Sequence, residues 1–184
     1  MQDKRIQRTQ HVLAQALIAL TLEKGYESIS IRDLTAYAGV GYATFFRHYP
    51  DKDALLLDVV DVVLDEVTAL LEPQMATGAP EAVGTLLFQY VQEHTQLCRV
   101  LLGSHGSAAL RQRIHQAGVR NILDHYTPRP DSQIPPNIAA NHLVASTLAL
   151  VQWWLDHDMP YTPAQMGAIY RDLIVQPTLA VAFC

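Results

Sequence analysis

The stretch between residues 30 and 55 holds several cationic and polar side chains: Arg32, Thr44, Arg47, His48 and Lys52. Guanidinium, ammonium, imidazole and hydroxyl groups all donate hydrogen bonds to phosphate oxygens and to other anions. Cations of this kind are usually ordinary solvated side chains, so their types alone do not establish a binding site. Their meaning depends on the elements that position them.

Two short helices joined by a glycine turn are predicted for this stretch. Ser30 and Asp33 have the spacing of a capping box, which starts a helix over about residues 31–38. Gly39 forms the turn, and a second short helix follows over about residues 42–47. A short helix, a tight turn and a second short helix form a helix-turn-helix, the shape of many DNA-reading domains.

Helical periodicity continues on both sides of this stretch and predicts an all-α fold. The further helices are expected at about residues 4–24, 51–73, 81–94, 98–102, 107–126 and 137–157, and from residue 162 onward. Pro73 is expected to end its helix and open a loop to Pro80, and the apolar tail after Pro177 is expected to pack. The interpretation is a helix-turn-helix domain over residues 1–52 and a helical domain over residues 53–184.

The predicted helix over residues 137–157 is apolar on two sides. One side carries Ile138, Ala145, Ala149 and Trp153, and the other carries Val144, Leu148, Val151 and Leu155. A helix that is apolar most of the way round must be covered on both sides. This pattern indicates a partner for the side that the chain itself leaves open.

Charge is distributed unevenly along the chain, whose formal net charge is −5. Residues 1–52 contain seven Lys and Arg against five Asp and Glu, an excess of two, so the remainder carries −7. This uneven charge suggests that residues 1–52 bind an anion. The two cysteines form no disulfide scaffold, no signal peptide is evident, and the most apolar run is shorter than the roughly 20 residues of a membrane span. A cytoplasmic protein without a membrane span is expected.

Residues 30–56 resemble the DNA-binding signature of the TetR family of transcriptional regulators, through the segments IRDLTAYAGVG and ATFFRHYPDKDALL. The C-terminal segment LVQWWLDHDMPYTPAQMGAIYRDL resembles the last two helices of a subgroup that includes regulators similar to the activator of dihydroxyacetone kinase operons. The family resemblance implies that the protein binds a double-stranded DNA operator and forms a homodimer through its last two helices. It also implies a small-molecule effector that binds inside the helical domain over residues 53–184. It makes a repressor the default expectation.

The same resemblance assigns DNA binding to Arg32, Gly41, Tyr42, Ala43, Thr44, Phe46, Arg47, His48 and Lys52. It implies phosphate contacts for Thr44 and Lys52, and a base or phosphate contact for Arg32. Gly41 stands where Ser or Thr commonly caps the reading helix, and Phe46 stands where Tyr is frequent. Tyr42 and Phe46 lie four residues apart, so they either touch thymine methyl groups and sugars in the major groove or pack on each other.

Effector contacts are expected among residues with apolar bodies and polar tips: Tyr90, His94, Cys98, His105 and Trp153. Each of these is more often a satisfied core residue, and Cys98 is either a redox sensor or, more commonly, a buried inert thiol. No metal or cofactor is expected, because the potential ligands lack a binding-site spacing.

The sequence does not resemble an enzyme, because it lacks a glycine-rich phosphate loop, a nucleophile elbow and a helical His-Glu metal motif. The expected function is a ligand-responsive transcriptional regulator, with repression as the sense that the family resemblance implies. The alternative is a co-regulator or ligand-binding interaction protein with weak or no autonomous DNA binding.

Overall fold

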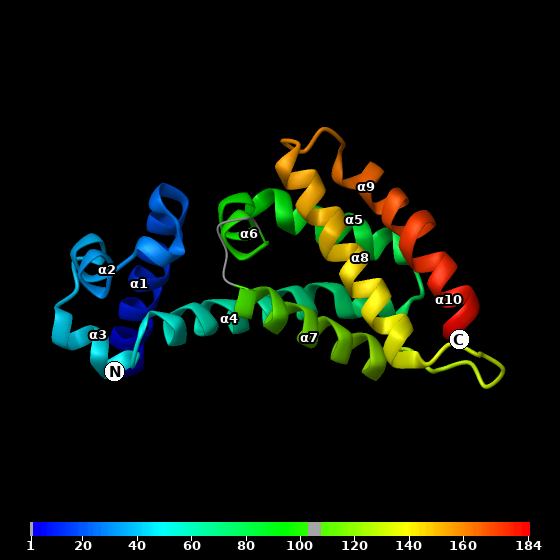
Figure 1. Cartoon of the computed structure of the whole chain (residues 1–184), viewed down its shortest axis with the longest axis horizontal. Helices are drawn as coiled ribbons and strands as arrows, with labels where there is room; N and C mark the ends of the chain where they lie inside the picture. The colour runs from blue at the N-terminus through cyan, green and yellow to red at the C-terminus, as the bar shows by residue number, and fades with distance from the viewer. Residues whose placement is uncertain (1, 103–107) are drawn as a thin grey trace. The chain divides into compact units, whose positions relative to one another are not determined.

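A computed structural model describes residues 2–102 and 108–184 of the chain. These residues are helical apart from short connections and one isolated bridge between Pro128 and Phe183, which confirms the all-α prediction (Figure 1). The elements are α1 (Gln2–Lys24), the 3-10 turn η1 (Tyr26–Ser28), α2 (Ile31–Ala38), α3 (Tyr42–His48), α4 (Lys52–Ala76), α5 (Pro80–Glu93), α6 (Thr95–Leu102), α7 (Ala108–His125), α8 (Pro136–Asp156), α9 (Pro163–Tyr170), the π turn η2 (Arg171–Val175) and α10 (Gln176–Ala182).

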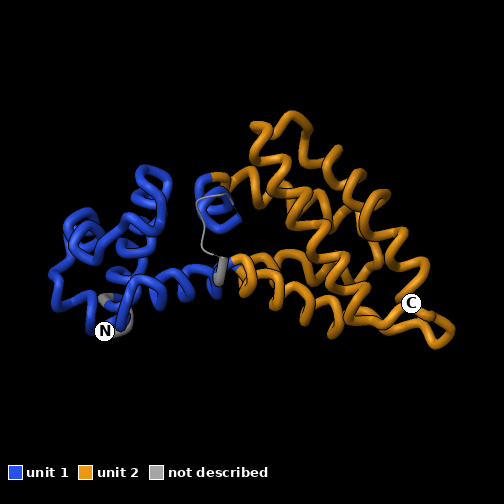
Figure 2. The backbone as a smooth tube through the Cα atoms, in the orientation of Figure 1, with its two compact units in different colours: residues 1–63, 96–110 blue, residues 64–95, 111–184 orange. Residues whose placement is uncertain are grey.

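The chain forms two compact units (Figure 2). Unit 1 comprises residues 1–63 and 96–110, and unit 2 comprises residues 64–95 and 111–184. The domain boundary predicted after residue 52 lies at the first turn of α4, whereas the two units divide this helix after Val63. The predicted boundary stays a prediction, since compactness alone does not define an independently folding domain.

The core of unit 1 lies where α1, α2, α3 and the first turns of α4 meet. Its completely buried side chains include Leu13, Leu17, Leu34, Phe45 and Leu55. Phe45 comes from the middle of α3, so burial of this ring fixes which face of α3 points away from the core. The other sides of α3 carry side chains that were predicted to bind DNA.

Pro73 does not end its helix as the sequence predicted, and a second proline, Pro177, also lies inside a helix. Pro73 lies inside α4, which continues to Ala76, because the proline stands in the last turn, where it removes one backbone bond only. Pro177 lies inside α10. The wide turn η2 comes directly before it, and the Gln176 N–H there bonds to the Arg171 carbonyl five residues back. This π turn takes up the distortion that a proline imposes on a regular helix.

Unit 2 is built on a very close crossing of α5 and α9. A Cβ atom added at Gly167 would lie 2.7 Å from the Glu81 carbonyl oxygen and 2.7 Å from the Thr85 nitrogen. A Cβ atom at Gly84 would lie 2.9 Å from the Gly167 Cα. The two helices therefore touch backbone to backbone, which only glycine permits at these positions.

A capping box starts α9, as predicted: Thr162 accepts from the Gln165 backbone N–H, and the Gln165 side chain accepts from the Thr162 N–H. The apolar tail also packs as predicted. Phe183 is 2% exposed, and the Cys184 N–H donates to the Thr127 carbonyl at 2.9 Å. The C-terminus thereby ties down the proline-rich loop that follows α7.

Helix α8 packs on one side and is open on the other. The Trp154 ring meets Phe88 of α5 edge to face at 5.1 Å, whereas Ile138 and Trp153 are 57% and 41% exposed. Ala145 and Ala149, which the sequence placed on the same side as these two residues, are exposed as well. By length and composition α8 would be able to cross a membrane, but a core helix meets the same criterion, and seven residues of α8 are buried.

Candidate nucleic-acid interface

The start of α2 is held by hydrogen bonds between side chain and backbone. The Asp33 N–H donates to the Ser30 hydroxyl at 3.2 Å, and the Ser30 N–H donates to the Asp33 carboxylate at 2.9 Å, so the predicted capping box is present. The ammonium of Lys24 lies 2.9 Å from the same carboxylate. Lys24 and, next, the Ser30 bonds hold the pKa of Asp33 far below its usual range. Arg32 is exposed on this fixed first turn.

The turn between α2 and α3 is formed by two glycines with different roles. Gly39 forms the turn that was predicted, with a φ of 64° in the left-handed region, and its N–H closes the end of α2. Gly41 precedes α3 with a φ of −64° and makes no side-chain cap. A Cβ atom there would meet only the Thr44 hydroxyl, at 3.5 Å. Gly39 is therefore required by the backbone, whereas Gly41 is not.

The exposed face of α3 carries the residues expected to bind DNA. Gly41, Tyr42, Ala43, Phe46 and Arg47 are exposed, and Thr44 and His48 are half-buried. Tyr42 and Phe46 are 51% and 45% exposed, and their rings meet at 5.1 Å in an edge-to-face arrangement. The two aromatic side chains thus pack on each other, as one of the two alternatives predicted, and still present a surface to solvent.

Lys52 makes hydrogen bonds inside unit 1. Its ammonium donates to the carbonyls of Tyr26, Glu27 and Ile29 at 3.0, 3.4 and 3.2 Å, and it lies 4.4 Å from the centre of the Tyr26 ring. An ammonium has three N–H donors, and all three are directed at protein carbonyls. The phosphate contact expected for Lys52 stays a prediction, and the structure shows the internal contacts of this side chain.

Two tyrosines tie the first turns of α4 to the rest of unit 1. The Tyr26 hydroxyl donates to Asp53, and the Tyr49 hydroxyl donates to Asp58 at 2.5 Å. Burial and then the bond to the carboxylate raise the pKa of both phenols above their usual value. Both phenols therefore stay protonated hydrogen-bond donors throughout the physiological pH range.

The charge count points to two further cations that the predicted set omitted. All of the positive excess of residues 1–52 comes from residues 1–8, because residues 9–52 contain four basic and four acidic residues. Lys4 and Arg8 are exposed and lie one turn apart on α1. The Gln10 side chain is hydrogen-bonded to Tyr49, the residue that follows α3, so this part of α1 lies beside the end of α3 (Figure 1). Counting charge by segment would have found these residues.

The residues predicted to bind an effector each have partners in the structure or lie outside the described residues, and their role stays a prediction. The Tyr90 hydroxyl donates to Glu66 at 2.9 Å, and the Tyr90 ring lies 4.3 Å from the exposed ring of His94. Trp153 stacks on His157 at the end of α8. Cys98 belongs to unit 1, and burial raises the pKa of its thiol to about 12, which favours the inert-thiol interpretation. His105 lies outside the described residues.

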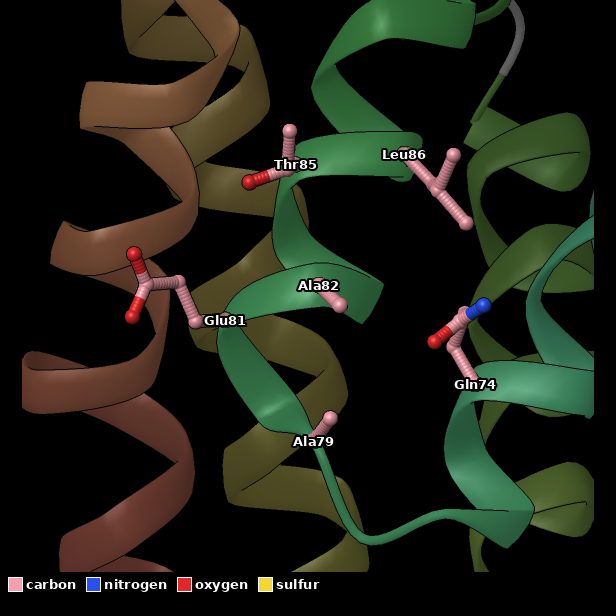
Figure 3. Close-up of a pocket in the computed structure, with 6 residues that line it drawn as sticks. All are labelled: Gln74, Ala79, Glu81, Ala82, Thr85 and Leu86. Atoms are coloured by element: carbon pink, nitrogen blue, oxygen red, sulfur yellow. The ribbon is translucent and has the colours of Figure 1, made fainter.

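A pocket of about 540 Å³ in unit 2 contains none of the predicted effector residues. It is lined by Gln74, Ala79, Glu81, Ala82, Thr85 and Leu86. Gln74 comes from α4 and the others from α5 or the residue before it (Figure 3). Glu81 and Thr85 point away from Gln74, and Glu81 is paired with Arg171 (Figure 3). The carboxylate is therefore already engaged, and the pocket offers few free polar groups to a ligand.

Comparison with known proteins identifies the family. The sequence model for bacterial regulatory proteins of the tetR family matches residues 13–59, and the model for a transcriptional regulator C-terminal region matches residues 80–176. The chain belongs to the TetR family. An HTH-type transcriptional repressor of Mycobacterium tuberculosis is 31% identical over 134 residues, which are 72% of this chain and 66% of that protein. This TetR protein thus spans about two thirds of the length of that relative.

Solved structures show the TetR fold. A TetR transcriptional regulator from Streptococcus agalactiae matches with a TM-score of 0.70 and 22% identity, over 94% of this chain and 97% of that chain. NalD, the secondary repressor of the MexAB-OprM multidrug efflux pump in Pseudomonas aeruginosa, matches with a TM-score of 0.69 and 20% identity, over 96% and 97%. These matches do not decide the subgroup that the C-terminal segment resembles.

Proposed function

We propose that this TetR protein is a dimeric transcriptional repressor of the cytoplasm that binds operator DNA through α2 and α3 and is released by a small-molecule effector. The observation that carries the proposal is the geometry of α3. Its buried side is fixed by Phe45, and its other sides expose Tyr42, Phe46 and Arg47 after a left-handed glycine turn. Membership of a family of DNA-binding regulators supports this assignment.

DNA recognition is proposed to combine cationic anchors with an apolar reading surface. Arg32 and Arg47 contact phosphates or base edges from the two exposed helices, and the Thr44 hydroxyl and His48 add phosphate contacts. Tyr42 and Phe46 present ring edges that fit thymine methyl groups in the major groove. The packing of these two rings on each other fixes their orientation before DNA arrives, which lowers the entropic cost of binding.

A homodimer through the last helices is proposed from the open side of α8. Ile138, Ala145, Ala149 and Trp153 are exposed there, and Leu173 and Val181 of the following helices are 68% and 50% exposed. Two alanines in the middle of the face allow a second helix to approach closely. An apolar face of this kind on a soluble regulator is expected to be buried against a second copy of the chain.

The sense of regulation and the response to an effector rest on relatives. The Mycobacterium tuberculosis protein is named a repressor, and NalD represses an efflux pump. In our proposal the effector binds within unit 2 and changes the affinity of the dimer for DNA through a two-state quaternary change. The alternative, a co-regulator without autonomous DNA binding, has no observation in its favour beyond the few charges on α3.

A mobility-shift assay with DNA from upstream of the protein's own gene tests the proposal, with increasing salt to separate electrostatic from base contacts. A specific shift that weakens steeply with salt supports it. Arg32→Ala should weaken this shift by about tenfold or more, since a good contact contributes roughly 1–3 kcal/mol. Failure to shift any DNA at low salt would reject DNA binding and favour the co-regulator. A thermal-shift screen of metabolites then searches for the effector, because a ligand of the native state raises the unfolding temperature.

A further inference from the structure

The loop between α1 and α2 is fastened to the first turn of α4 at two places. Lys52 donates to three carbonyl acceptors of this loop, those of Tyr26, Glu27 and Ile29. The carboxylate of the next residue, Asp53, accepts a hydrogen bond from the Tyr26 hydroxyl. We refer to these contacts of Lys52 and Asp53 with residues 26–29 as the α4 latch. The contacts of Lys52 and the contact of Asp53 both join residues more than twenty positions apart in the sequence, so the latch is a tertiary contact.

The latched loop leads directly into the capping box of α2. Ile29 is 3% exposed and is followed by Ser30, the cap residue, and then by the first turn that carries Arg32. Its position relative to α4 therefore fixes the starting point of α2. The Tyr26 carbonyl also accepts from the Ile29 N–H at 3.2 Å, and the Lys52 ammonium adds a donor to this carbonyl and to those of Glu27 and Ile29.

We propose that Lys52 is a positioning residue that sets the place of Arg32 on DNA through the α4 latch, and does not itself bind a phosphate. The inference rests on the proposed DNA binding. Its physical basis is the complete use of the three ammonium donors inside the protein, at 3.0–3.4 Å. A phosphate would have to displace one of these carbonyls, which would leave a loop carbonyl without its partner.

The test is a double-mutant cycle measured as DNA affinity. Lys52→Met keeps the apolar stem and removes the three donors, and Arg32→Gln removes the guanidinium. If Lys52 acts through Arg32, Lys52→Met weakens binding about tenfold in the wild-type background but less than about threefold when Arg32→Gln is already present. The matched control is Arg47→Gln on α3. Its effect and that of Lys52→Met should combine additively, within about twofold.

The salt dependence of binding separates the two roles further. In the Arg32→Gln background, Lys52→Met should leave the slope of log affinity against log salt unchanged. If Lys52 contacted a phosphate directly, Lys52→Met would instead make the slope shallower by roughly 1 for each subunit. Additive effects of Lys52→Met and Arg32→Gln, together with this change of slope, would overturn the proposal. Lys52→Arg, whose guanidinium offers several donors and also stacks on a ring, should restore most of the affinity.

Two measurements keep the inference testable on their own. If Lys52→Met does not fold, Tyr26→Phe replaces it in the double-mutant cycle. This variant removes the hydrogen bond to Asp53 and keeps the aromatic ring of residue 26. In the DNA-free protein, Lys52→Met should speed amide hydrogen exchange of residues 29–34 and leave residues 42–48 unchanged. Equal exchange in both segments would overturn the latch even if no operator is found, whereas a wild-type protein that fails to bind any DNA would reject the proposed function alone.

Discussion

The two compact units differ in the contacts that stabilise each of them internally. Unit 1 uses polar side chains that reach backbone groups, as in the Ser30–Asp33 capping box and the contacts of Lys52. Unit 2 uses the absence of side chains, since Gly84 and Gly167 bring α5 and α9 into backbone contact. Hydrogen bonds from side chains to the backbone fix the direction of a short helix, whereas a close crossing fixes how two helices pack. In our proposal, the DNA-binding unit needs the first property, and the unit that forms the dimer needs the second.

The largest expected effect comes from breaking the helix crossing with Gly167→Ala. The new methyl group would meet backbone atoms of α5, which are unable to move aside, so we expect a decrease of about 3 kcal/mol in the free energy of unfolding. Gly118→Ala is the control, because the new methyl group there would meet only the Val144 side chain, at 3.0 and 3.2 Å. Urea unfolding measures both. A Gly167→Ala protein as stable as Gly118→Ala would disprove the rigid crossing.

Removing one cap from each unit sharpens the comparison. Ser30→Ala and Thr162→Ala each delete a capping-box hydroxyl, and each should cost about 1 kcal/mol of unfolding free energy. Only Ser30→Ala should also weaken operator binding, because it loosens the first turn that carries Arg32. Calorimetry and a mobility-shift titration of both variants test this. Equal DNA affinities of the two variants would contradict the assignment of α2 to the interface.

Acid should weaken unit 1 through Asp33. The pKa of this carboxyl in the folded protein is lowered from its ordinary value of 3.8 by Lys24 and Ser30. Its stabilising contribution is therefore complete above the ordinary pKa and disappears as the pH falls from about 5 towards 2. Asp33→Asn should flatten the fall of the unfolding temperature in this window. Since the carboxylate is exposed, added salt should reduce the difference between the two proteins.

A smaller effect on DNA binding is expected from the exposed cations of α1. The double variant Lys4→Gln and Arg8→Gln should make the salt dependence of operator binding shallower by about 1 for each phosphate that is no longer neutralised, with sequence preference unchanged. Arg120→Gln, an exposed cation of unit 2, is the matched control. The same slope for the double variant and this control would show that α1 does not touch DNA.

The smallest effect is expected at the start of α3. Gly41→Ser should be accepted without strain, because φ is negative there and the added Cβ meets only the Thr44 hydroxyl at ordinary contact distance. The new hydroxyl can cap α3, and the expected gain is a few tenths of a kcal/mol, roughly the difference between glycine and serine caps. Thermal unfolding measures this gain. A decrease in stability would indicate that position 41 does not accept a side chain, although its φ is negative.

Sequence reasoning succeeded where a few neighbouring residues decide the outcome. Both capping boxes, the turn at Gly39 and the two-sided character of α8 follow from local patterns, and the structure has all of them. The open side of α8 was also visible in advance, because an apolar side without a partner in the chain still appears in the helical spacing.

Reasoning from sequence failed where partners lie far apart. The carbonyls that Lys52 binds are more than twenty residues away, and a carbonyl leaves no mark in the sequence. The prediction that Pro73 ends its helix was wrong, because the effect of a proline depends on its place in the helix, which the sequence alone does not give. The glycine crossing of α5 and α9 was missed as well, since a residue without a side chain gives no periodic signal.

The π turn η2 makes the exact length of the last helix important. Because the turn holds one residue more than an α-helical turn, every side chain after it is rotated by about 100° from the α-helical direction. Deleting one residue between 171 and 175 would restore the regular spacing and turn the segment after it to another face. Phe183, whose ring now lies 5.7 Å from that of Tyr126, would be carried away from this partner. Insertions and deletions in this helix therefore alter its surface as strongly as substitutions do.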